Sequence, residues 1–323
     1  MSRWLFALAL AAGLLPISHA DAQPFPNKTI TITVTSAAGG LTDVLTRAVA
    51  QRLSQMWNQT VVIENRGGAG HTLAAAAIAK SPADGYALLA TETGMFTMQP
   101  HLYAKGKLPF ATEDFVPIAG FASIPMALLV HPSVPANSVK ELIALAKEKP
   151  GIMSYGTAGL GTSPHMGAAL LESLAGIKLT AIHYRGANPA LNDVIAGHIN
   201  MITMGPSIAL PTVRAGKIKM LGFGSLTRVP QFAEVPTIAE TIPGYQAGVS
   251  FGLFAPAAVP REIVLKVNAD VQKVLADPAF REKILDPQVV EPVPNSPEAY
   301  AGYIQSESDK WSKVIRGANL RIE

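Results

Sequence analysis

The N-terminal part of the chain shows a change in the period of its apolar positions. Residues 28 to 36, KTITITVTS, alternate between polar and apolar or β-branched residues, which predicts a half-buried strand. Two alanines and two glycines follow at 37–40. Apolar residues then recur at helical spacing from Val44 to Met56, so a helix is predicted there, with Thr42 or Asp43 as its N-cap.

Strands and helices alternate along the rest of the chain. Short β-branched or apolar runs predict further strands at 61–64, 86–91, 126–130, 153–157, 181–184, 201–204, 218–222 and 250–254. Helical spacing predicts helices at 73–79, 138–147, 163–174, 261–275 and 297–316. Ser296 and Pro297 suit the N-cap and first position of the last helix. This order predicts an α/β fold with parallel strands and crossover helices.

Length and composition add a domain count. The chain has 323 residues, more than the roughly 250 at which a single core stops growing, so two domains are expected. Apolar residues make up 49% and charged residues 15%, which excludes a disordered chain. The net charge is +3, with Lys and Arg scattered along the sequence, so nucleic-acid binding is not predicted. A weakly positive field favours anionic ligands.

Residues 1–22 have the features of a cleaved signal peptide. Arg3 precedes an uncharged apolar run from Trp4 to Leu15, Pro16 ends the run, and small residues follow at 20–22. The alternative is a membrane anchor, but the run is well short of the roughly 20 residues that span a bilayer. We therefore expect cleavage after Ala22 and a protein free in the periplasm. The sequence has no cysteine, which excludes a lipid anchor on an N-terminal cysteine, a thiol nucleophile and a thiolate metal site.

Two segments, 36–43 and 158–165, share one pattern of strand, small glycine-rich loop and helix. In open α/β sheets ligands bind at the carboxyl ends of strands, against helix N-termini. Free N–H groups and the helix dipole favour an anion there, and glycine permits close approach. The alternative is that both loops are ordinary turns. Two such loops in a chain of two-domain length favour one shared binding site.

The signals for an enzyme are weak. Residues 248–252 fit the hydrolase pattern G-x-S-x-G, but the residues after Ser250 predict a strand where a nucleophile elbow needs a helix. No phosphate-binding loop or paired histidine metal spacing occurs, and no cofactor or metal is expected. His165 could contact a ligand or simply cap and pack. Arg185, after Tyr184, could present a cation to a carboxylate or stay solvated.

A series of motifs makes the whole mature chain resemble the tripartite tricarboxylate transporter substrate-binding proteins, also called the Bug family. The motifs are Ala37-Ala38-Gly39-Gly40-x-x-Asp43, Val62-x-Glu64-Asn65-Arg66-x-Gly68-Ala69-Gly70, Asp84-Gly85-Tyr86, Pro132-Ser133-Val134-Pro135, Tyr155-x-x-Ala158-Gly159-x-Gly161-Thr162-Ser163-x-His165, Tyr184-Arg185-Gly186, Ala215-Gly216-Lys217, Val235-Pro236-Thr237, Phe251-Gly252-Leu253-Phe254-Ala255-Pro256 and Trp311.

The resemblance implies a type II periplasmic-binding-protein fold, in which two α/β lobes are joined by two crossing strands and close on a ligand. It places lobe 1 at 23–122 plus 251–323 and lobe 2 at 123–250. In such proteins a loop from each lobe holds a ligand carboxylate through backbone amides and water. The ligand-binding residues expected here are Ser36, Ala38, Gly39, Gly40, Asp43, Thr91, Ala158, Gly159, Gly161, Thr162, Ser163, His165, Tyr184, Arg185, Met204 and Gly205.

The resemblance also implies a monomer that delivers a small carboxylate to integral membrane transporter subunits. The sequence departs from the family pattern at Thr35-Ser36, where Pro-Phe is common, and at Asn200-Met201, where Val-Asp is usual. The following positions, which are often polar or acidic in the family, are Thr203, Met204 and Gly205. Fewer acidic groups at these positions favour a carboxylate ligand without an amino group, and aromatic acids are among the candidates. A ligand-sensing subunit for a membrane signalling system, or an exported hydrolase using Ser250, remain alternatives at this stage.

Overall fold

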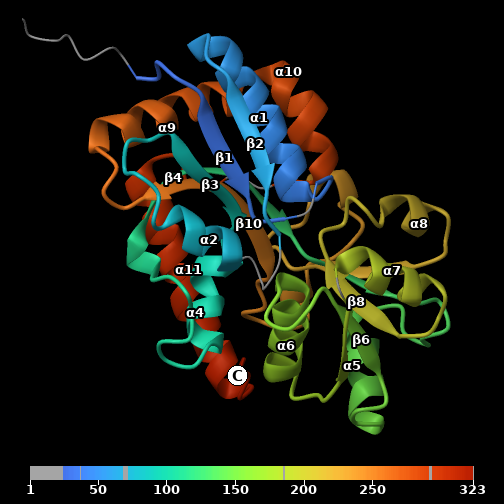
Figure 1. Cartoon of the computed structure of the whole chain (residues 1–323). Coiled ribbons are helices and arrows are strands. Elements are labelled where there is room, and N and C mark those ends of the chain that lie inside the picture. The colour runs from blue at the N-terminus through green and yellow to red at the C-terminus, as the bar shows by residue number, and fades with distance from the viewer. Residues whose placement is uncertain (1–24, 37, 68–71, 185, 291–292, 323) are drawn as a thin grey trace, which may run out of the picture.

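The computed structural model describes residues 25–322 except 37, 68–71, 185 and 291–292, so the expected signal peptide lies outside the described residues. The described residues form two separate five-stranded sheets with helices packed around them (Figure 1). The first sheet has the strand order β2-β1-β3-β10-β4. Its strands are β1 (Ile30–Val34), β2 (Val61–Asn65), β3 (Ala87–Glu92), β4 (Phe115–Pro125) and β10 (Gly248–Pro256).

The second sheet repeats this arrangement with a different stretch of chain. Its order is β7-β6-β8-β5-β9. The strands are β5 (Ala127–Val130), β6 (Ser154–Thr157), β7 (Thr180–His183), β8 (Met201–Met204) and β9 (Lys219–Phe223). In both sheets three parallel strands lie on one side, and the fourth strand runs antiparallel to its neighbours. β1 and β6 therefore hold equivalent positions in the two lobes.

The chain crosses between the two sheets at two adjacent points. Met126 joins β4 to β5, and residues 224–247 join β9 to β10. Three backbone hydrogen bonds tie the crossings together: Met126 N–H to Ala247 O at 2.9 Å, Ala247 N–H to Gly224 O at 2.9 Å, and Gly224 N–H to Met126 O at 2.7 Å. A Cβ at position 224 would lie 2.3 Å from the Ala247 oxygen, so this close approach requires glycine.

The helices pack around the sheets, and the longer amphipathic ones do so through an apolar face. In α1 (Leu41–Trp57) the buried apolar residues include Leu45, Val49 and Leu53, which confirms the predicted helical spacing. The other helices are α2 (Thr72–Ile78), α3 (Gly94–Thr97), α4 (Gln99–Leu102), α5 (Val139–Glu148), α6 (Ser163–Ala175), α7 (Ala187–Ile195), α8 (Leu210–Arg214), α9 (Arg261–Ala276), α10 (Pro278–Phe280) and α11 (Pro297–Gly317).

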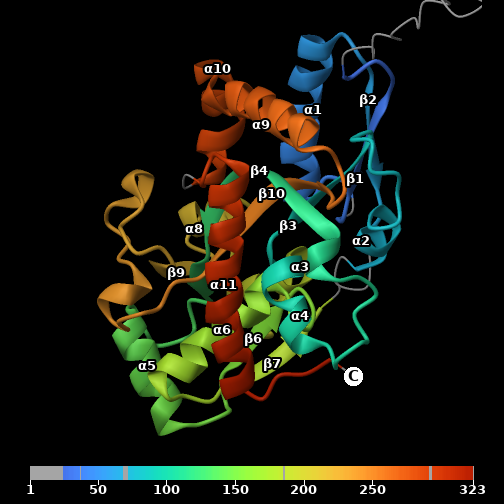
Figure 2. The same cartoon turned by 90° about the vertical axis from the view of Figure 1, so that its left-hand side faces the viewer.

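Helix α11 contacts the cores of both lobes (Figure 2). Tyr300 and Ile304, near its N-terminus, pack with residues of β3, β4 and β10. Trp311 and Ile315, in its C-terminal half, pack with residues of the second sheet and α6. The long helix therefore braces the two lobes in addition to the crossing strands.

One local prediction about these elements was wrong, and one strand was not predicted. The N-cap of α1 is Gly40, and Thr42 and Asp43 lie inside its first turn, because the Asp43 carboxylate turns back to accept the N–H of Gly39. Strand β4 has no predicted counterpart, since its prolines and glycine interrupt the alternation that marks a strand. The predicted cap of α11 is confirmed: Ser296 Oγ accepts the Ala299 N–H at 3.1 Å.

Candidate functional site

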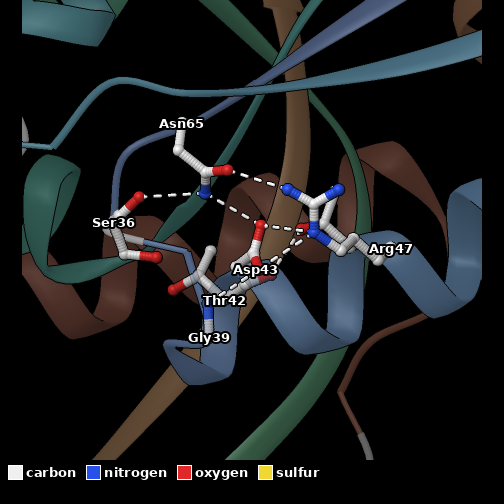
Figure 3. A network of polar contacts seen from close by, with 7 residues as sticks. Ser36, Gly39, Thr42, Asp43, Arg47 and Asn65 are labelled. Atoms are coloured by element: carbon white, nitrogen blue, oxygen red, sulfur yellow. Dashed lines mark hydrogen bonds and ion pairs between the residues drawn. The ribbon is translucent and has the colours of Figure 1, made fainter.

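The first candidate loop joins β1 to α1 and is held by the Asp43 side chain (Figure 3). Asp43 Oδ2 accepts the N–H of Gly39 at 2.9 Å, and Gly39 takes the left-handed conformation with φ +78°. Arg47 lies one turn further along α1, with Nε 2.9 Å from Asp43 Oδ1. Asn65, at the end of β2, donates Nδ2 to Asp43 Oδ1 at 2.8 Å and to the Ser36 carbonyl at 3.1 Å. Both carboxylate oxygens are thus committed to the loop itself.

These contacts set the charge state of Asp43, which is only 3% exposed. Burial alone raises the pKa of a carboxyl group, but here the hydrogen bonds from Arg47, Gly39 and Asn65 outweigh burial and hold the pKa of Asp43 below its usual value. The residue is therefore an anion, and both of its oxygens accept hydrogen bonds from Gly39, Arg47 and Asn65.

The loop leaves other polar groups for a ligand. The first N–H groups of a helix have no acceptor within the helix, and in α1 these belong to Leu41, Thr42 and Asp43. The hydroxyl of Ser36 is buried and has no hydrogen-bond partner among the described residues. A buried, unsatisfied hydroxyl costs free energy unless a ligand or water completes it.

The second candidate loop joins β6 to α6 at the equivalent place in the other lobe. Gly161, with φ +73°, donates its N–H to His165 Nδ1 at 3.0 Å. Thr157 Oγ1 accepts the Gly159 N–H at 3.2 Å, and Thr162 Oγ1 donates to the Gly159 carbonyl at 2.7 Å. Because Pro164 has no N–H, the unsatisfied amides in the first turn of α6 are those of Ser163 and His165.

His165 is neutral in this arrangement. Its Nδ1 accepts a hydrogen bond, so the proton of the neutral ring is on Nε2. The ring is 3% exposed and lies 5.2 Å from the ring of His183 and 6.3 Å from that of Tyr155. Burial, with a smaller contribution from the charge of His183, lowers the pKa of His165 to about 4. The histidine therefore supports the loop from beneath, as its 3% exposure indicates.

The other predicted site residues differ in their surroundings. Thr91 is fully buried and shares a 2.9 Å hydrogen bond with Thr35, so it supports the end of β3. Met204 is buried, while Gly205 is partly exposed. The Tyr184 hydroxyl donates to Asp193 Oδ2 at 2.6 Å. Of the remaining predicted residues, Ala38 is exposed, Gly40 and Ala158 are partly exposed, and Arg185 lies outside the described residues.

Sequence reasoning missed Glu92. This residue ends β3 in the first sheet, and its Oε1 accepts a hydrogen bond from Ser163 Oγ of α6 at 3.5 Å. A carboxylate of one lobe therefore meets the first turn of a helix of the other lobe. Its place directly after Thr91, at the carboxyl end of a parallel strand, was the available signal.

Ser250 lacks the surroundings of a nucleophile. It is 1% exposed in the middle of β10, and its hydroxyl lies 3.3 Å from the Tyr300 hydroxyl. Within the described ranges, no group of three or more His, Asp or Glu side chains could hold a metal ion. In the same part of the chain, no helix is long and apolar enough to cross a membrane.

Two lobes with the same strand order, joined by two bonded crossings and each carrying a glycine loop at an equivalent place, define a type II periplasmic-binding-protein fold. The family model described as the tripartite tricarboxylate transporter family receptor matches residues 45–320. The chain belongs to this receptor family, as its motifs suggested.

Relatives of known sequence agree with this assignment. A protein encoded in the tcbD-tcbE intergenic region of Pseudomonas sp. (strain P51) is 34% identical over 312 residues, covering 96% of this chain and 91% of that protein. Protein BugT of Bordetella pertussis is 30% identical over 318 residues, covering 98% of this chain and 96% of BugT.

Solved structures of similar proteins match nearly the whole chain. A protein of R. palustris with adipate has a TM-score of 0.83 and 32% identity, covering 92% of this chain and 99% of that one. MatC from Rhodopseudomonas palustris with bound malate has a TM-score of 0.79 and 30% identity, with 90% and 100% covered. The periplasmic binding protein BugD has a TM-score of 0.79 and 29% identity, with 93% and 100% covered. These similarities confirm the predicted fold class.

Proposed function

We propose that the protein is a periplasmic receptor that captures a small organic carboxylate for a tripartite tricarboxylate transporter. The observation that carries the proposal is the pair of glycine loops at equivalent places in the two lobes, each followed by a helix with unsatisfied N–H groups. A helix N-terminus favours a carboxylate through these N–H groups and its dipole. Two members of the fold were solved with adipate and with malate, both dicarboxylates.

We propose further that the ligand has no amino group. Asp43, the acidic residue of the first loop, has both oxygens engaged and cannot also pair with an ammonium group. In the second lobe Met204 is buried, and the Thr203 hydroxyl donates to the Pro164 carbonyl at 2.7 Å. These contacts support a ligand held by its carboxylate. The carboxylate of Glu92 already accepts a hydrogen bond from the Ser163 hydroxyl.

The expected signal peptide at 1–22 supports export to the periplasm, and the similar protein BugD is described as periplasmic. In this proposal the protein works as a monomer, closes on its ligand between the lobes and touches the membrane subunits only transiently. It binds without converting the ligand, which agrees with a buried Ser250 and with a family of receptors.

A thermal-shift screen tests the ligand class. Adipate, malate, citrate, benzoate, glutamate and aspartate are added to the purified mature protein at one pH. We expect at least one acid without an amino group to raise the melting temperature with increasing concentration, because a ligand that binds only the folded state stabilises it. Stabilisation by glutamate or aspartate alone would contradict the proposed ligand class. No stabilisation by any of the acids would contradict carboxylate capture.

A pair of variants at Leu41 tests the role of the backbone amide. Leu41→Pro removes the N–H at the first position of α1, where proline is tolerated, and Gly40 already has the extended backbone that a following proline requires. Leu41→Ala removes the same side chain but keeps the N–H. We expect Leu41→Pro to bind the stabilising acid at least about tenfold more weakly than Leu41→Ala in calorimetric titrations. Equal affinities would exclude this amide from the site.

A further inference from the structure

The two glycine loops are held by the same device. In the first lobe the N–H of Gly39 is bound by the side chain of Asp43, four residues later. In the second lobe the N–H of Gly161 is bound by the side chain of His165, also four residues later. Both glycines are left-handed, with φ +78° and +73°, and both acceptors lie in the first turn of the following helix.

We propose that Asp43 and His165 are matched positioning residues, each of which fixes the left-handed glycine of its loop so that the neighbouring amides face the ligand. The proposal rests on the proposed function, because it assigns these loops to the ligand. Both residues are 3% exposed and act through the backbone, so neither is expected to touch the ligand.

The geometry explains why an acceptor is needed at these positions. A left-handed glycine reverses the chain direction, and several backbone conformations are open to it when nothing holds its N–H. A hydrogen bond from that N–H to a buried side chain selects one of them. Because these hydrogen bonds occupy the N–H groups of Gly39 and Gly161, neither group is free to bind a ligand. Leu41 and Ser163 are the first residues of the two helices, and their N–H groups have no acceptor within the helix.

The two lobes use different acceptors with different support. Asp43 is an anion held by Arg47 of α1 and Asn65 of β2, so its position is set by two side chains from two elements. His165 is a neutral ring held by packing against Tyr155 and His183. Leu102 and Ile322 also lie close to Gly161: a Cβ built there would be 2.4 Å and 3.5 Å from their side-chain carbons.

A pair of variants separates the acceptor from the rest of the side chain. In His165→Asn the Oδ1 atom can occupy the place of the imidazole Nδ1, so the hydrogen bond from Gly161 is kept. In His165→Leu the volume is closer to that of histidine, but there is no acceptor. A role limited to filling the core predicts that leucine is the better replacement, whereas a positioning role predicts that asparagine is.

Nuclear magnetic resonance of the ligand-free, isotope-labelled protein tests the hydrogen bonds directly. We expect a through-hydrogen-bond coupling between the Gly161 amide nitrogen and His165 Nδ1 at neutral pH. We also expect the amide of Gly39 to exchange with solvent more than about tenfold faster in Asp43→Ala than in the unmodified protein. Absence of the coupling, or unchanged exchange at Gly39, would overturn the proposal for that lobe.

Titration with adipate, and with benzoate as a second probe, then tests the effect on binding. We expect His165→Leu to bind the acid about tenfold more weakly than the unmodified protein, and His165→Asn to retain affinity within about threefold. Equal loss in both variants, or no loss in His165→Leu, would overturn the positioning role. If the unmodified protein binds none of the acids of the thermal screen, the proposed function fails, and the positioning role fails with it. In that case the coupling still shows whether the hydrogen bond between Gly161 and His165 forms.

Discussion

At the scale of single residues, two buried titratable groups bind the backbone of the two glycine loops. Asp43 and His165 are both nearly inaccessible, and each accepts a backbone N–H that would otherwise be free. Burying such groups is costly unless they are hydrogen-bonded, and each has its partners from within its own lobe. Their substitution should therefore cost more stability than that of ordinary surface charges.

Asp43→Ala should destabilise the protein by about 2 kcal/mol, since it removes an anion that Gly39, Arg47 and Asn65 all contact. The matched control is Glu64→Ala, which removes a carboxylate from the exposed ion pair with Arg66 and should cost less than about 1 kcal/mol. Urea unfolding at pH 7 measures both. Because the pKa of Asp43 is lowered by folding, its contribution is fully present at this pH and is lost only in acid. Equal losses of unfolding free energy in the two variants would show that the hydrogen bonds of Asp43 stabilise the protein no more than a surface ion pair does.

His165 should make stability depend on pH between about 4 and 6.5. Folding lowers the pKa of this group from 6.5 to about 4, so in this range the unfolded state binds a proton that the folded state does not. The free energy of unfolding should therefore fall as the pH falls, by roughly 3 kcal/mol for this residue. The titratable groups around the ring are His183 and Tyr155, and the Tyr155 hydroxyl donates in turn to Glu172.

His165→Asn provides the comparison, because asparagine does not titrate. The difference in unfolding free energy between this variant and the unmodified protein should narrow as the pH is lowered from 6.5 to 4. Parallel pH profiles for the two proteins would mean that His165 is already protonated in the folded state, or that it is more accessible than its surroundings indicate.

At the scale of elements, the loop after β6 is confined from two sides. Gly161 has a left-handed backbone, and the side chain of Leu102, from α4, occupies the space that a Cβ would need. Gly176, which ends α6, has a similar backbone with φ +62° but nothing within 4 Å of a built Cβ. Comparing the two glycines therefore separates the cost of a left-handed backbone from the cost of a side chain that clashes with Leu102.

Gly161→Ala should cost about 3 kcal/mol of stability, and Gly176→Ala about 1 kcal/mol. Both variants place an alanine in the left-handed region, which is unfavourable, but only Gly161→Ala also forces Leu102 to move. Thermal or urea unfolding of the two variants measures the difference. Similar losses would mean that the contact between α4 and the loop relaxes without cost.

The sequence predicted elements better than it predicted contacts. The alternation at 28–36 and the short apolar or β-branched runs located β1 and the strands of the second sheet to within about two residues. Helical spacing located α1, because its buried residues recur on one face. Strand β4 was missed, since Pro117, Gly120 and Pro125 interrupt its pattern. The two loops were recognised from their glycines. That Asp43 and His165 bind those glycines, and that Glu92 reaches Ser163, depends on side-chain directions in the folded chain.

At the scale of the whole molecule, the two lobes are equivalent in topology and linked by few segments. The crossings at Met126 and 224–247 are bonded to each other, and α11 packs on both cores. This arrangement can change the angle between the lobes while each sheet stays intact, which is how a hinge-type receptor closes on its ligand. The assignment of residues to lobes, with 23–122 plus 251–323 in one and 123–250 in the other, stays a prediction.

The most direct test is a crystal structure of the mature protein with the acid that stabilises it most. The account predicts that one carboxylate of the ligand lies within hydrogen-bond distance of a backbone N–H from the first turn of α1 and of another from the first turn of α6. A carboxylate bound by one lobe alone would contradict it. So would a ligand found instead in the 560 Å³ cavity beside Arg316 and Arg321, at the C-terminal end of α11.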